Sequence, residues 1–103
     1  MSYVTAADVA SPANKWKFER VMLDRGEGLG VYCIGYWDMR PVICYRWNGN
    51  SEQHKGNPVS RGYPTWMVLA DEDYPVIIEI FPAAEREYAR KFLNLLPAPK
   101  FIL

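Results

Sequence analysis

The sequence predicts an α+β fold in which a five-stranded, mainly antiparallel sheet carries one C-terminal helix packed on one face, giving two layers. Two observations predict this class. Most of the chain is divided into short runs rich in β-branched and aromatic residues, which are typical of strands. Helical periodicity of apolar residues is confined to one segment, which begins at Pro82. The 103 residues are 50% apolar and 15% aromatic, which suits a single globular domain with its own core.

The first 14 residues are expected to form a loose N-terminal leader, followed by a single α+β domain over residues 15–103. The leader is small and polar, although the spacing of Thr5 and Asp8 allows one short helical turn. Residues 15–23 largely alternate apolar and polar side chains, which predicts a half-buried strand. The glycines that follow it predict a turn with a bulge.

Residues 29–37 and 42–47 are dense in β-branched and aromatic residues, and the short gap between them predicts a tight hairpin. A two-residue loop at Asp38 and Met39 would place Cys33 opposite Cys44, although methionine is poorly suited to the positive φ of such a turn. Both faces of the hairpin are then largely apolar. One face collects Val31, Cys33, Gly35, Trp37, Val42, Cys44 and Arg46, and the other collects Tyr32, Ile34, Tyr36, Ile43, Tyr45 and Trp47.

Residues 48–62 lack apolar periodicity and form the longest predicted loop. Residues 63–70 and 75–81 are expected to be two further strands, joined by an acidic turn. The helix begins at Pro82 and stops at Pro97. One helix of this length covers only one face of a five-stranded sheet, so the other face is expected to be exposed to solvent or to contact another protein.

The aromatic face of the hairpin and the basic loop beside it form the candidate binding surface. Because aromatic and arginine side chains dominate protein interfaces, we expect a small non-enzymatic binding or regulatory protein that contacts a protein partner or a second copy of itself. The alternative is a single-stranded nucleic-acid-binding module, whose aromatic rings would stack on bases while the basic residues of 40–61 contact phosphates. The predicted binding residues are Tyr32, Tyr36, Tyr45, Arg46, Trp47, Lys55, Arg61, Tyr63 and Trp66.

The sequence predicts no catalytic residue, no metal site and no cofactor. His54 is the only imidazole, which excludes a multi-histidine metal site. A third hypothesis is a small RNA-cleaving toxin, with His54 as acid or base and Arg61 at the phosphate. Cys33 and Cys44 lack the spacing of a redox or zinc motif and are expected to be buried thiols.

Charge and hydropathy limit the partners. The 12 basic and 12 acidic residues cancel, which argues against a protein whose main task is to coat nucleic acid. The charges are nevertheless segregated, since residues 40–61 are mainly basic and residues 71–87 mainly acidic, a pattern that favours a charged partner or pairing with a copy. No apolar run is long enough to span a bilayer and no signal peptide is evident, so a cytoplasmic location without membrane contact is expected.

Overall fold

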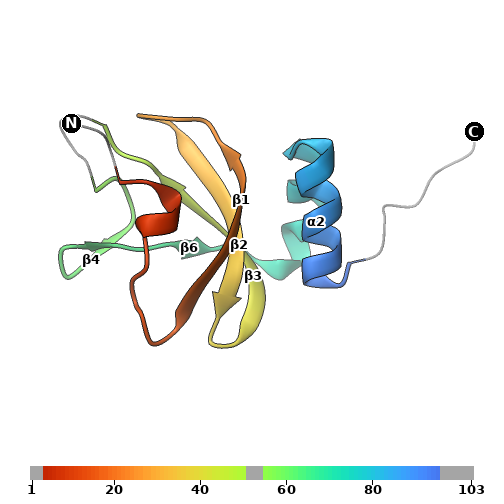
Figure 1. Cartoon of the computed structure of the whole chain (residues 1–103), viewed down its shortest axis with the longest axis horizontal. Coiled ribbons are helices and arrows are strands. Elements are labelled where there is room, and N and C mark those ends of the chain that lie inside the picture. The colour runs from red at the N-terminus through yellow and green to blue at the C-terminus, as the bar shows by residue number, and fades with distance from the viewer. Residues whose placement is uncertain (1–3, 51–54, 96–103) are drawn as a thin grey trace, which may run out of the picture.

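A central antiparallel sheet separates a helical layer from the N-terminal segment and a small second hairpin in the computed structural model of the chain (Figure 1). The structure describes residues 4–50 and 55–95. The α+β class with an antiparallel sheet and a helix is confirmed.

The main sheet has four strands rather than five. Its order is β1 (Trp16–Asp24), β2 (Gly30–Trp37), β3 (Arg40–Trp47) and β6 (Met67–Val68), all antiparallel. Two further strands, β4 (Val59–Ser60) and β5 (Tyr63–Pro64), form a separate two-stranded sheet. The prediction of one five-stranded sheet is therefore wrong. Residues 63–70 supply two short strands to different sheets, and Pro64 cannot donate a backbone hydrogen bond to continue a ladder.

The β2–β3 hairpin confirms the predicted turn and register. Asp38 and Met39 form its loop with φ of 53° and 67°, and Cys33 lies opposite Cys44. A two-residue turn with positive φ matches the right-handed twist of the strands on either side. Pairing of the strands therefore holds Met39 in a backbone conformation that methionine rarely adopts.

Replacing Met39 with glycine is expected to raise the free energy of unfolding by about 0.5 to 1 kcal/mol. The left-handed backbone costs an L-residue roughly 1–2 kcal/mol, and glycine avoids this cost while losing more entropy on folding. Met39 is 92% exposed, so the change removes no core contact. Thermal unfolding followed by calorimetry measures the rise, and a glycine variant that melts below the parent would contradict the proposed turn strain.

Residues 71–80 form a helical segment where the sequence predicted an acidic turn followed by a strand over residues 75–81. The segment consists of η2 (Asp71–Asp73), α1 (Tyr74–Ile77) and η3 (Ile78–Ile80). Its buried side chains are Tyr74 and Ile78, followed by Phe81 just beyond η3, which is the spacing of one helix face rather than strand alternation. Pro75 lies in the first turn of α1, where a missing N–H is harmless.

Helix α2 (Ala83–Leu93) begins after Pro82, as predicted. Asn94 ends it in the left-handed conformation, and its backbone N–H donates to the carbonyl oxygens of the last turn. Ala89 is the fully buried position, with Tyr88 and Phe92 half-buried beside it. The apolar spacing of the sequence predicts that Ala84, Tyr88 and Phe92 face the core, and the structure has Tyr88 and Phe92 there but leaves Ala84 exposed. The helix also ends at Leu93, before the predicted stop at Pro97.

Both faces of the main sheet are covered, which corrects the expectation of an uncovered aromatic face. On the helical side, a buried cluster joins Ile34 and Ile43 to Tyr74, Ile78 and Phe81. The physical reason for the difference is that residues 71–80 act as part of the cover instead of adding a strand to be covered.

The opposite face is covered by the segment that the sequence describes as a leader. The short helix η1 (Ala6–Asp8) forms at the expected place, and the Thr5 hydroxyl donates to Asp8 at 2.8 Å. Ala6 and Val9 are buried against Cys33, Cys44 and two tryptophans. This packing places residues 4–9 in the second core of the domain, on the far side of the sheet from α2.

Candidate functional site

A groove lies at the C-terminal end of β3, where the strand changes its neighbour. Tyr45 pairs with Met67 of β6, whereas Trp47 forms an isolated bridge with Asn57 through backbone bonds of 2.8 and 3.0 Å. Residues of both contacts line a pocket of about 590 Å³. We call this pocket the Trp47 groove and define it by Tyr45, Arg46, Trp47, Pro58, Val59 and Met67.

Arg46 is a buried part of this groove and not an exposed ligand-binding group. Only 1% of it is exposed, and its guanidinium donates to the carbonyl oxygens of Thr65 at 2.5 Å, Pro58 at 3.4 Å and Lys55. Burial lowers the pKa of Arg46 to about 10, which still leaves it charged at neutral pH. In the part of the chain that the structure describes, it makes no ion pair and its Nε has no hydrogen-bond partner. Arg46 therefore attaches the 55–65 segment to β3.

Trp47 and Asn48 connect β3 to the glycine turn between β1 and β2. The indole Nε1 of Trp47 donates to the carbonyl oxygen of Gly28 at 2.7 Å. The buried side-chain amide of Asn48 donates to the Asp24 carboxylate and to the Gly26 carbonyl oxygen, each at 2.9 Å. The predicted glycine turn is confirmed, since Gly26 and Gly28 have φ of 96° and 73°. These bonds hold the position of the Trp47 ring at one wall of the groove.

Exposed apolar side chains surround the groove. Val59 is 41% exposed and Met67 49%, which is unusual for two large apolar side chains that line one groove. Lys55 and Arg61 are exposed beside them. The Lys55 amine lies next to Gly62 in the β4–β5 turn, and Arg61 belongs to the same turn. The surface is therefore apolar with a basic margin.

The predicted binding residues separate into two groups. Tyr45, Arg46 and Trp47 line the Trp47 groove, and Lys55 and Arg61 lie beside it at the β4–β5 turn. Tyr63 lines a different pocket, together with Pro64 and residues 8–13 of the N-terminal segment. Tyr32 and Tyr36 do not line the groove. The Tyr32 ring packs between Tyr45 at 4.7 Å and Phe81 at 5.6 Å, and the Tyr36 ring packs on Phe92 at 5.0 Å. Trp66 lines the groove but is 4% exposed and donates from its indole to Val9. Its ring is part of the core with Trp16.

Three groove residues were missed in the sequence. Pro58, Val59 and Met67 lie in a predicted loop and in a predicted strand, and nothing in their spacing places them beside Trp47. One feature of the sequence could have indicated part of the groove. Val59 is an apolar residue within a polar loop, and such a residue often makes a contact.

The two cysteines are buried free thiols, as predicted. Burial raises the pKa of Cys44 to about 12. The pKa of Cys33 is raised well above its usual value, mainly by burial and to a smaller extent by the neighbouring Cys44 thiol. Neither thiol is a nucleophile at neutral pH. His54, proposed as an acid or base, lies outside the described residues.

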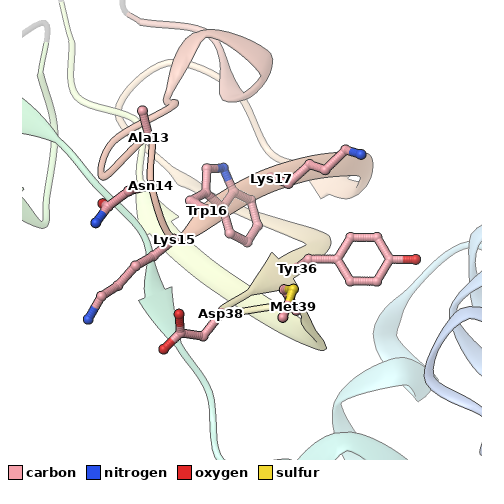
Figure 2. Close-up of a pocket in the computed structure, with 8 residues that line it drawn as sticks. All are labelled: Ala13, Asn14, Lys15, Trp16, Lys17, Tyr36, Asp38 and Met39. Carbon is pink, nitrogen blue, oxygen red and sulfur yellow. The ribbon is translucent and has the colours of Figure 1, made fainter.

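A second pocket, of about 380 Å³, lies at the start of β1 and the β2–β3 turn (Figure 2). Its polar groups do not converge, since the amines of Lys15 and Lys17 extend in opposite directions (Figure 2). Within residues 4–50 and 55–95, no cluster of three metal-ligating side chains occurs, and no helix has the length and apolar character needed to cross a membrane. No protein-family model, no curated protein and no solved structure matches the chain.

Proposed function

We propose that this chain is a small non-enzymatic binding protein and that the Trp47 groove is the surface that holds its protein partner. The observation that carries the proposal is the pair Val59 and Met67, two large apolar side chains left exposed in the lining of a groove with aromatic walls. Burying such side chains against a partner stabilises a complex by roughly 25 cal/mol per Å² of apolar surface before the costs of association.

A protein partner suits the groove better than a nucleic acid does. Base stacking needs open aromatic faces, and two of the three tyrosines that the nucleic-acid alternative requires pack on phenylalanines of the helical layer. The arginine it requires at position 46 is buried among carbonyl oxygens. A partner segment with an apolar anchor and a nearby carboxylate would match the apolar groove and its margin of Lys55 and Arg61.

Met67→Asp is expected to reduce recovery of the partner at least about tenfold in affinity capture from a host-cell lysate, because a buried interface position then carries an unpaired charge. Met67 is half-exposed at the surface, so the fold should persist, which a thermal melt checks. A photo-crosslinking residue placed at Val59, which lines the groove and is 41% exposed, identifies the captured protein and the site of contact.

Met39→Asp is the matched control, since it makes the same change at a methionine that is 92% exposed on the β2–β3 turn. It should leave capture unchanged. Equal capture by all three proteins, with no crosslink from position 59, would rule out the groove as the binding surface.

A further inference from the structure

The basic apolar groove has a counterpart of opposite charge on the helical side of the same molecule. Val76 is 75% exposed and Ile80 is 46% exposed, although both are aliphatic residues of short helices. Asp71, Glu72 and Asp73 are exposed at the start of the same segment. We call these five residues the acidic helix face.

The packing of the segment explains why this face points outward. Tyr74, Ile78 and Phe81 enter the core, and helical spacing then directs Val76 and Ile80 to the opposite side. In the part of the chain that the structure describes, none of the three acidic residues of this face forms an ion pair. Arg40 lines a pocket with Asp71 and Glu72 but forms no ion pair with them. The segment therefore presents exposed apolar side chains together with exposed carboxylates, as the Trp47 groove would require of its occupant.

The two surfaces cannot meet within one molecule. The segment 71–80 lies on the helical side of the sheet, and β4, which carries the wall of the groove, lies at the far end of the molecule (Figure 1). The chain measures 50 Å along its longest axis. A second copy brings the two surfaces together without any change in fold.

We infer that the Trp47 groove binds the acidic helix face of a second copy of this chain. This inference rests on the proposed function, which it deepens by naming the partner. In the complex, Val76 and Ile80 of one copy fill the groove of the other beside Val59 and Met67. Lys55 and Arg61 then face Asp71 and Asp73, which sets the orientation of the two copies.

Such a contact joins two different surfaces, so each added copy leaves one groove and one acidic helix face free. Heterologous contacts of this kind build rings or open chains rather than a closed two-fold dimer. The average mass in solution should therefore rise beyond that of a dimer with concentration. Because the charges are exposed, the association should weaken at high salt, where screening acts over a few ångströms.

Charge reversal tests the inference with the intact chain. One variant carries Lys55→Glu and Arg61→Glu, and the other carries Asp71→Lys and Asp73→Lys. In sedimentation velocity at low salt, each variant alone should associate at least about tenfold more weakly than the parent. The protein with all four substitutions should regain association, since both surfaces have then exchanged charge. Lys15→Glu with Lys17→Glu makes the same change in net charge away from both surfaces and should associate like the parent.

Val76→Ser removes an apolar contact without changing charge and should weaken association at low and at high salt. A parent protein that stays monomeric at every concentration would overturn the inference, as would association that the reversals leave unchanged. These outcomes differ from failure of the proposed function: a monomeric protein whose capture of another protein is sensitive to Met67→Asp keeps the groove and loses only this partner.

Discussion

Arg46→Ala is expected to lower the free energy of unfolding by about 3 to 5 kcal/mol, a large share of the roughly 5–15 kcal/mol available to a domain of this size. The guanidinium donates to three carbonyl oxygens on Lys55, Pro58 and Thr65, and truncation leaves all three without this donor. It also opens a cavity where a fully buried side chain stood. Urea unfolding followed by circular dichroism measures the loss.

Two arginine variants separate this structural role from a general effect of charge. Arg46→Lys keeps the positive charge, but one ammonium cannot match the fork of a guanidinium, so an intermediate loss is expected. Arg61→Ala removes an arginine that is exposed and should change stability by no more than about 0.5 kcal/mol. An Arg46→Ala protein as stable as the parent would show that the 55–65 segment does not depend on these bonds.

The hairpin was predictable because both of its strands are rich in β-branched and aromatic residues, although Met39 is poorly suited to the turn between them. With a two-residue loop at Asp38 and Met39, the two runs pair in the register that puts Cys33 opposite Cys44, as the structure does. The same alternation assigned Arg46 to the face of Val42 and Cys44, both fully buried. Burial of Arg46 was therefore implied by the pattern, although arginine is seldom buried and was interpreted as a binding residue.

The helical segment was missed because its local preferences favour a strand. Val76, Ile77, Ile78 and Ile80 are β-branched, and such runs are typical of strands. Tertiary packing overrides this preference by burying residues at helical spacing against the sheet. The groove was also only partly predictable, since it depends on where the 55–67 segment returns to β3, and no periodicity in the sequence encodes that return.

Phe81→Ala is expected to lower the free energy of unfolding by about 3 to 5 kcal/mol, which is the usual cost of removing a buried phenylalanine. The ring is 1% exposed and contacts Tyr32 of β2, so it joins the helical layer to the sheet. The substitution should weaken the packing of the helical layer on the sheet more than the packing within the sheet. Amide hydrogen exchange should accelerate in α2 more than in the β2–β3 hairpin, because local opening of the helical layer then costs less.

The isoleucines of the same segment give the matched test. A strand over residues 75–81 would place Ile78 and Ile80 on the same face, whereas the helical segment buries Ile78 and leaves Ile80 46% exposed. Ile78→Ala should therefore cost about 2 to 5 kcal/mol, while Ile80→Ala should cost less than about 1 kcal/mol. Equal losses at the two positions would favour the strand, and would also remove Ile80 from the acidic helix face, since a side chain needed in the core is not free to enter a neighbouring groove.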